Sequence, residues 1–487
     1  MTFTKLIEKA SKSVGEKNYK EAVKLYKKAL PHEPNNKKIY FNLGVVYLHL
    51  EEFYNAIENF KKALSLDKDY VSAYSNLAIC YKKIKEYHKT INCLFKALQL
   101  SKTPDVDIYY NLGNTLSSIE EYSKAISYFD KVIEIDPTYY KAYHAKGLVF
   151  NHLTDYKKAL WYFKKTLEYK SDYSDSIFAI SLIELRNGDF INGWEHYESR
   201  FEATNPLKKL SYELPFYNGE NITNKTILIQ EEQGFGDNIQ FIRYIELIKK
   251  ENPKKIYVAV RKELIRVFEL IDGINVVTNE DILYDIDFVV SLLSMPRIFK
   301  TTLETIPINI PYLRVSLSDD ISFQIIQNTK KIKVGFAYQG NKEHKNDNYR
   351  SIPLEIFKTL FTLEDVEFYS LQIGENKELL KIQKEYHNVF DCNEIVSDFH
   401  DSGQILSHLD FIITIDSALA HFSGALGKIT YLLLSQNSEW RWLESRVDSP
   451  WYPSVTIFRQ KELGMWGEVI DEVQKKLENN LLIKKQV

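Results

Sequence analysis

The segment Tyr40–Leu64, YFNLGVVYLHLEEFYNAIENFKKAL, returns three more times along the chain. The copies begin at Tyr74, Tyr109 and Tyr143, at spacings of 34 or 35 residues. In the first copy large residues (Tyr40, Leu43, Tyr47) recur at helical spacing, and small residues (Gly44, Ala56, Ala63) mark places of close approach. One such helix pair cannot cover its own apolar stripe, so the pattern predicts stacked helix pairs that share a continuous core.

The period and the pattern resemble the tetratricopeptide repeat (TPR). A less regular copy precedes the four, NYKEAVKLYKKALPHEP, and another follows them, IFAISLIELRNGDFINGWEHYESRF. Pro34 and Pro137 stand where second helices should end, because proline cannot continue a helix. We therefore expect an all-α TPR solenoid of about six repeats over residues 1–205.

Asparagine occupies the same repeat position in three copies, at Asn42, Asn76 and Asn111. This resembles the asparagine ladder with which the O-linked N-acetylglucosamine transferase holds a peptide backbone. A carboxamide suits that role because it offers both a donor and an acceptor. The alternative is that asparagine only solvates the groove, and Ala145 interrupts the series in the next copy.

The composition excludes several classes of protein. The net charge of the 487 residues is -3, so no global basic field favours nucleic acid. Three cysteines lie far apart without metal or disulfide spacing, which fits a reducing compartment. No apolar stretch approaches the ~20 residues of a membrane span, and the N-terminal stretch has no signal core. We expect a cytoplasmic protein without a membrane span.

The second part of the chain changes its period. A linker over 206–224, rich in proline, asparagine and glycine, precedes short Val/Ile-rich runs that alternate with helical patterns. Such runs are typical of buried parallel strands. They fall into two groups, which predict an acceptor-side domain over 225–320 and a nucleotide-sugar domain over 331–487. Two facing doubly wound (Rossmann-like) domains, with a cleft between strand C-termini, form the GT-B arrangement of many sugar transferases.

The stretch ILIQEEQGFGDNIQF, Ile227–Phe241, predicts a strand, a turn and a helix. Only Gly234 and Gly236 match the dinucleotide fingerprint, because its third glycine would fall at Ile239, so no nicotinamide or flavin cofactor is expected. Asp237 stands at the start of the helix. It is either a helix cap or a base that faces the cleft.

From about Leu214 onward the sequence resembles TPR-fused bacterial glycosyltransferases related to the ADP-heptose:lipopolysaccharide heptosyltransferases. The resemblance is carried by EQGFGDNIQFIRY, TTLETIPINIPYL, GNKEHKNDNYRSIPL, ITIDSALAHFSGALG and SEWRWLESRVDSPWYP. It implies an inverting reaction with Asp237 as the catalytic base. It also implies that Gln233, Gly234 and Gly236 contribute to the donor site.

The segment LDFIITIDSALAHFSGALGK predicts a strand, a turn at Asp416–Ser417 and a helix. The free N–H groups of a helix N-terminus bind phosphates, and Ser417 and Ala418 are small enough to admit them. His421 lies about one turn into the helix, where it can donate to the ligand. The resemblance makes this segment the nucleotide-diphosphate loop; the alternative is an ordinary strand–helix unit capped by Asp416.

The polar segment YQGNKEHKNDNYRSIP follows the strand IKVGFAY. Lys345 and Arg350 can neutralise the charge that develops on a leaving diphosphate. The remaining donor-site candidates offer hydrogen bonds: Asn341, His344, Ser351 and Gln372. A solvated surface loop is the alternative for this segment. Asp285 and Asp287 form a DxD triplet, but it leads directly into a strand, so we expect no metal site.

The patterns and the resemblance together imply a metal-independent, inverting glycosyltransferase without a bound cofactor, which uses a nucleotide-diphosphate sugar as co-substrate. The solenoid would recruit the acceptor, a protein such as a flagellin or an adhesin. One alternative is transfer to lipopolysaccharide or another glycan. Another is a TPR interaction scaffold whose transferase part is inactive.

Overall fold

The computed structural model describes residues 1–204, 214–278, 280–281, 283–316, 326, 329–342, 347–374 and 377–486. The chain divides into two compact units, Met1–Ser176 and Ile177–Val487. The linker predicted over 206–224 is described only from residue 214 onward. No helix among the described residues is long and apolar enough to cross a membrane.

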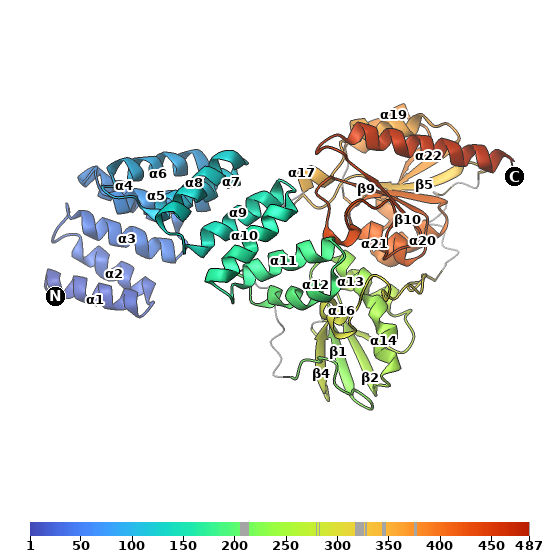
Figure 1. The fold of residues 1–487 in the computed structure, drawn as a ribbon, viewed down its shortest axis with the longest axis horizontal. Coiled ribbons are helices and arrows are strands. Elements are labelled where there is room, and N and C mark those ends of the chain that lie inside the picture. Colours follow the sequence, from blue (N-terminus) through green and yellow to red (C-terminus); the bar gives the residue numbers. More distant parts are fainter. Residues whose placement is uncertain are drawn as a thin grey trace. The chain divides into compact units, whose positions relative to one another are not determined.

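The first unit is a succession of antiparallel helix pairs, the TPR solenoid expected from the repeats (Figure 1). Its helices are α1 (Phe3–Gly15), α2 (Tyr19–Ala29), α3 (Lys37–His49), α4 (Phe53–Leu66), α5 (Val71–Lys83), α6 (Tyr87–Leu100), α7 (Val106–Ser118), α8 (Tyr122–Ile135), α9 (Tyr140–His152) and α10 (Tyr156–Tyr169).

Glycine sets the distance between the two helices of three repeats. A Cβ atom on Gly113 would lie 2.5 Å from the ring of Phe129, and Gly44 and Gly147 stand equally close to Phe60 and Phe163. The three phenylalanines are fully buried. The small-residue positions of the repeat therefore exist because a phenylalanine of the second helix packs directly on the first.

The last helix pair, α11 (Ser174–Arg186) and α12 (Phe190–Tyr197), leads into the short 3-10 helix η1 (Glu198–Phe201). Its aromatic residues pack into the core of the second unit. Trp194 meets the rings of Phe241 and Trp440 edge to face, at centroid distances of 5.7 and 5.2 Å. The end of the repeat pattern thus supplies core residues to the α/β fold.

The first sheet of the second unit has four parallel strands in the order β3-β2-β1-β4. These are β1 (Thr226–Gln230), β2 (Lys255–Ala259), β3 (Asn275–Val277) and β4 (Phe288–Ser291). The helical segments that join them are α13 (Phe235–Phe241), η2 (Ile242–Tyr244), α14 (Ile245–Lys250), α15 (Lys262–Phe268), η3 (Leu292–Ser294) and α16 (Met295–Ile298).

The second sheet has six parallel strands in the order β10-β9-β8-β5-β6-β7. Its strands are β5 (Ile332–Ala337), β6 (Val366–Ser370), β7 (Val389–Asp391), β8 (Phe411–Ile415), β9 (Thr430–Leu434) and β10 (Val455–Arg459). Its helical segments are α17 (Asp347–Arg350), α18 (Leu354–Phe357), η5 (Lys358–Thr362), α19 (Lys377–Glu385), η6 (Asn393–Ile395), α20 (Phe399–Ser407), α21 (Ala418–Ala425), η7 (Trp440–Trp442) and α22 (Trp466–Gln486).

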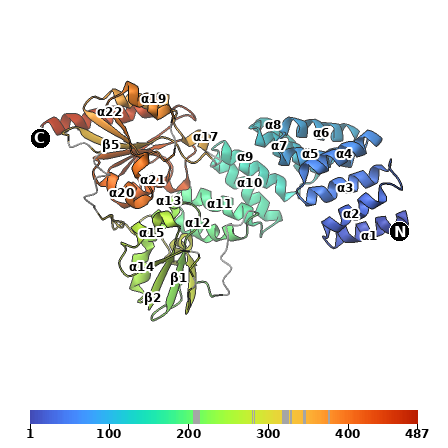
Figure 2. The same cartoon turned by 180° about the vertical axis from the view of Figure 1, so that it is seen from behind.

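Helices cover both faces of this second sheet, α19 and α22 on one face and α20 and α21 on the other (Figure 2). The C-terminal helix α22 buries Trp466, Val469 and Val473 against the sheet. The Val/Ile-rich runs of both groups form parallel strands, and β7 is an additional short edge strand. The second unit is therefore an α/β fold built on two parallel sheets.

Candidate functional site

The backbone of the turn that follows β1 holds the carboxylate of Asp237 by a hydrogen bond. Gly234 is the N-cap residue of α13, and its N–H donates to Asp237 Oδ2 over 2.8 Å. Gln233 before it adopts a left-handed backbone, with φ of 62°. Asp237 is thus a capping residue at the third position of its helix, which was one of the two readings of the sequence.

A buried ion pair holds the same turn to η1. Glu232 accepts two hydrogen bonds from Arg200, of 2.6 and 2.8 Å, in the bidentate geometry typical of arginine and carboxylate. The Arg200 side chain is fully buried. The N–H of Glu232 donates to Asn238 Oδ1 over 3.2 Å, and Gln233 Nε2 donates to the Tyr197 hydroxyl over 2.8 Å. These contacts fix the backbone on both sides of the glycines.

The turn that follows β8 starts α21 differently. Ser417, in an extended conformation, is the N-cap residue, and its side chain makes no cap hydrogen bond. The alternative prediction, that Asp416 caps this helix, is wrong. The Asp416 carboxylate instead accepts a hydrogen bond of 2.9 Å from Trp442 Nε1. Burial raises the pKa of Asp416. The half-buried Ala418 opens the helix without adding a polar group.

The two turns are in direct contact. Helix α13 packs on α21, and a Cβ atom on Gly236 would lie 2.7 Å from Cδ2 of His421. The His421 ring stacks on Trp442 at 5.1 Å, and its Nδ1 lies 3.0 Å from the Tyr452 hydroxyl. Burial lowers the pKa of His421 well below its ordinary value, so the ring is neutral at pH 7. Glycine at position 236 is what allows this approach.

Arg441, in η7 after β9, forms an ion pair with Asp237. Its Nε donates to Gln240 Oε1 over 3.0 Å, and its guanidinium lies 4.5 Å from the Trp440 ring centre. The side chains of Asp237 and Arg441 are 14% and 8% exposed. Burial is the main cause that raises the pKa of Asp237, and Arg441 and the Gly234 N–H oppose it. Arg441 lies in SEWRWLESRVDSPWYP, one of the stretches that carry the resemblance, but nothing in the sequence indicates its pairing with Asp237.

The segment after β5 reaches the same region through Arg350. Its Nη1 donates to the backbone oxygen of Asp416 over 3.2 Å, and its Nε lies 3.3 Å from Asp347 Oδ1. Ser351 accepts from the Gly340 N–H over 3.0 Å and donates to Asp347. Arg350 therefore lies beside the β8–α21 turn, while Ser351 is engaged within its own loop.

The other predicted residues of this region are placed as follows. Gln372 accepts from the N–H of Gln339 over 3.0 Å, which joins the ends of β5 and β6. Asn341 is exposed. His344 and Lys345 lie outside the described residues. In the DxD triplet, Asp287 accepts from the N–H of Thr226 over 2.8 Å and from Lys225 over 3.1 Å, so it braces the start of β1.

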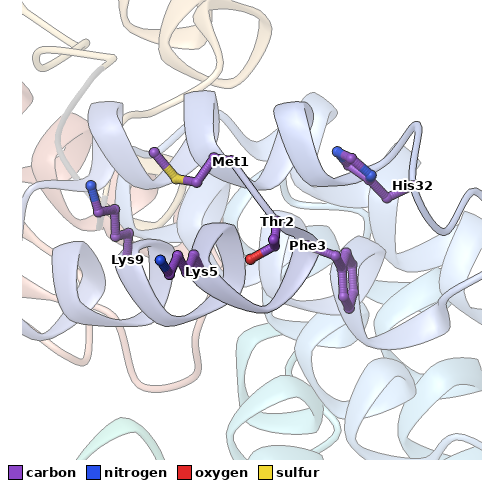
Figure 3. Close-up of a pocket in the computed structure, with 6 residues that line it drawn as sticks. All are labelled: Met1, Thr2, Phe3, Lys5, Lys9 and His32. Carbon is purple, nitrogen blue, oxygen red and sulfur yellow. The ribbon is translucent and has the colours of Figure 1, made fainter.

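The three asparagines of the solenoid are half-buried and do not share one environment. Asn76 donates to the Ser72 oxygen of its own helix over 2.9 Å. Asn111 lines a pocket between α5, α6 and α7. A larger, open hollow of about 930 Å³ lies at α1 (Figure 3). Its six lining residues point in different directions and include no predicted site residue: Met1, Thr2, Phe3, Lys5, Lys9 and His32.

Comparison with known proteins identifies the repeats. Residues 38–70 and 106–139 match the tetratricopeptide repeat model, and residues 16–51 match a second TPR model. Protein FlbA of Caulobacter vibrioides is 22% identical over 399 residues, covering 76% of this chain and 67% of its own length. The chain is thus a TPR-containing protein that is similar to FlbA across both units.

Solved structures match about a third of the chain. The crystal structure of MamA protein is 32% identical over 35% of this chain and 93% of its own, with a TM-score of 0.33. YrrB, titled a TPR protein with an unusual peptide-binding site, is 20% identical over 36% of this chain and 91% of its own, with a TM-score of 0.30.

Proposed function

We propose that the second unit is a GT-B glycosyltransferase that moves a sugar from a nucleotide-diphosphate sugar to a hydroxyl group, with inversion and without a metal ion. The sequence resemblance to heptosyltransferase-related enzymes motivates the proposal. The observation that carries it is the contact between the β1–α13 turn and the β8–α21 turn, one from each parallel sheet.

The location of four polar side chains supports this proposal. Asp237 follows β1, Arg350 follows β5, His421 follows β8, and Arg441 follows β9. Ligands of doubly wound folds bind outside the carboxyl ends of the parallel strands, where all four residues lie. The helix α21 has no side-chain cap, so its N–H groups and dipole are suited to a diphosphate.

In the proposed reaction the acceptor oxygen attacks the anomeric carbon and forms the new C–O bond. The bond between that carbon and the diphosphate oxygen breaks, and its electron pair leaves with the nucleoside diphosphate. The acceptor proton passes to the carboxylate of Asp237, the base. Arg350 and the start of α21 stabilise the charge of the leaving diphosphate.

Asp237 must first exchange a partner, because its carboxylate is paired with Arg441. A diphosphate carries more negative charge than one carboxylate and competes for the same guanidinium. Donor binding would therefore move Arg441 from Asp237 to the diphosphate and free the base. This predicts ordered kinetics, in which the donor binds before the acceptor.

The solenoid would recruit the acceptor, which we propose to be a protein rather than lipopolysaccharide or another glycan. Stacked TPR pairs form extended binding surfaces, larger than a small sugar acceptor requires. We further propose that the acceptor resembles a flagellin or an adhesin, and that the protein acts in the cytoplasm.

A thermal-shift screen of the purified chain against nucleotide-diphosphate sugars tests the function. A ligand that binds only the native state raises the melting temperature, by an amount set by its concentration relative to Kd. We expect one nucleotide class to stabilise the chain and to be hydrolysed slowly without acceptor, in the presence of a chelator. A screen without any stabilising donor contradicts the proposal, and a strict divalent-metal requirement contradicts its metal-independent form.

The rival function is a TPR scaffold with an inactive transferase fold, and one observation favours it. Asp237 already has two partners, the Gly234 N–H and Arg441, and both are consistent with a purely structural role. The scaffold predicts that no donor is turned over, although binding through the solenoid persists.

A further inference from the structure

A pocket of about 510 Å³ lies in the solenoid between α5, α6 and α7. This volume falls within the range of pockets that bind ligands. It is lined by Ala78, Ile79, Lys82, Lys83 and Lys85, by Tyr87, Thr90 and Leu94, and by Asn111, Thr115 and Ser118. The residues from α7 are spaced by four and three positions, so they form one face of that helix.

The pocket coincides with a local departure from the repeat. Three repeats pair a glycine with a phenylalanine, as at Gly44 and Phe60, but this repeat has Ala78 and Leu94 at the two positions. Thr90 replaces the alanine found in the other copies at Ala56, Ala125 and Ala159. Ala78, Thr90 and Leu94 all line the pocket, so the altered packing and the pocket occur at the same place.

The pocket is also positively charged. Lys85 stands where the neighbouring repeats have Glu51 and Glu120. The ion pairs of the solenoid use other lysines, and none joins Lys82, Lys83 or Lys85 to a described carboxylate. Burial, and then the charge of Lys83, lower the pKa of Lys82. A ligand that brings negative charge would relieve this repulsion.

The wall opposite the lysines distinguishes a peptide from a simple anion. Thr115 and Ser118 use their hydroxyl hydrogens on backbone oxygens of α7, over 2.7 and 2.9 Å. Thr90 does the same within α6 over 3.1 Å. Thr90 and Thr115 are fully buried and shape the wall, while the exposed Ser118 presents an acceptor oxygen that suits a peptide N–H donor. The Asn111 carboxamide offers both a donor and an acceptor.

We propose that this pocket binds an acidic segment of a partner protein, with its carboxylates on the three lysines and its backbone along Asn111 and Ser118. Ala78, Ile79 and Leu94 provide an apolar floor for the aliphatic parts of the segment. The proposal does not depend on sugar transfer. If the second unit is a transferase, the acidic segment belongs to its protein acceptor.

Fluorescence polarisation with the full chain tests the proposal. The probe is a fluorescein-labelled peptide of alternating glutamate and alanine, and the matched peptide has glutamine for glutamate. We expect the glutamate peptide to bind and the glutamine peptide to bind at least about tenfold more weakly, because close charge pairs contribute strongly to affinity. Equal binding of the two peptides would overturn the proposal.

Two variants locate the site. Lys82→Gln, Lys83→Gln and Lys85→Gln together should weaken the glutamate peptide at least about tenfold. The control variant, Lys20→Gln with Lys28→Gln and Lys68→Gln, removes the same charge from exposed positions and should bind like the wild type. Equal losses in the two triple variants would show unspecific attraction and contradict the proposal.

The second variant, Ala78→Gly with Leu94→Phe, restores the glycine–phenylalanine pair of the other repeats and keeps every charge. It should fold, as shown by an unchanged melting temperature or an increase, and should lose peptide affinity because the ring fills the pocket. Full affinity in the folded variant would contradict the site. Inorganic phosphate and the unlabelled glutamate peptide are then compared as competitors of the labelled peptide. If phosphate displaces it at a lower concentration than the unlabelled peptide does, the pocket is a phosphate site and the proposal is overturned.

Discussion

Two turns of the second unit have the same plan and opposite electrostatics. Both follow a central parallel strand and open a helix, α13 after β1 and α21 after β8. The first is closed by the carboxylate of Asp237, which accepts from the Gly234 N–H. The second begins at Ser417 without a side-chain cap. The start of α13 therefore carries an acidic side chain, and the start of α21 is suited to bind an anion. The proposed reaction requires both, a base for the acceptor and a site for the leaving diphosphate.

The strongest test of this comparison is Asp237→Asn. The amide keeps an oxygen for the Gly234 N–H but cannot take a proton from the acceptor. We expect turnover of the donor that the thermal screen identifies to fall by about 10²–10⁴-fold, while donor binding remains. Steady-state rates and titration of the donor measure the two effects. Unchanged turnover would place the base elsewhere and reduce Asp237 to a helix cap.

Arg441→Ala tests the pair that joins the two turns. Removal of one partner from a buried ion pair leaves an uncompensated charge, so we expect the free energy of unfolding to fall by about 3 kcal/mol. Urea denaturation measures the change. Asp237→Asn combined with Arg441→Ala should lose less than the sum of the two single changes, because the two residues interact. Strict additivity would show that the pair contributes no coupling.

Gly236→Ala tests the close approach of the turns. The new methyl group would meet the ring of His421, which lies between Trp442 and Tyr452 and has no free space. We expect a loss of about 1–3 kcal/mol of stability, the usual cost of overpacking. Gly467→Ala is the control, because a Cβ atom there meets nothing within 4 Å. A variant at position 236 as stable as this control would show that the turns separate easily.

The pH dependence follows from the raised pKa of Asp237. The base form is present only above that pKa, so the acidic limb of kcat/KM should lie above pH 3.8, the ordinary value for an aspartate. The folded protein also holds this proton more tightly than the unfolded chain. The free energy of unfolding of the wild type, compared with that of Asp237→Asn, should therefore fall as the pH rises from 3.8 through the pKa of Asp237 in the folded protein. A limb at or below pH 3.8 would contradict a buried base.

The sequence predicted the elements with a strong local signal. The repeat period indicates the helix pairs, and Val/Ile-rich runs such as Ile227–Ile229 indicate buried strands. Strand β7 was not predicted because Val389–Asp391 is too short to show a pattern. The Asp237–Arg441 pair could not be predicted, because 204 positions separate the two residues and only the packing of both sheets brings them together.

The solenoid pocket could be predicted from the sequence only in part. Its cause is visible in the aligned repeats, where Ala78 and Leu94 replace a glycine and a phenylalanine. The volume of the pocket, and the presence of Lys82 and Asn111 in it together, depend on three helices at once. A departure from a repeat can therefore be read from the sequence, but its chemical meaning requires the structure.

The most direct measurement is a calorimetric titration of nucleoside diphosphates into the wild type, Ser417→Ala and Ser417→Asp. A carboxylate at position 417, the N-cap of α21, would accept from the free N–H groups at the start of that helix and would occupy the place of the diphosphate. We expect saturable binding to the wild type and to Ser417→Ala, and loss of binding in a folded Ser417→Asp. Equal binding to all three proteins, or to none, would contradict this expectation.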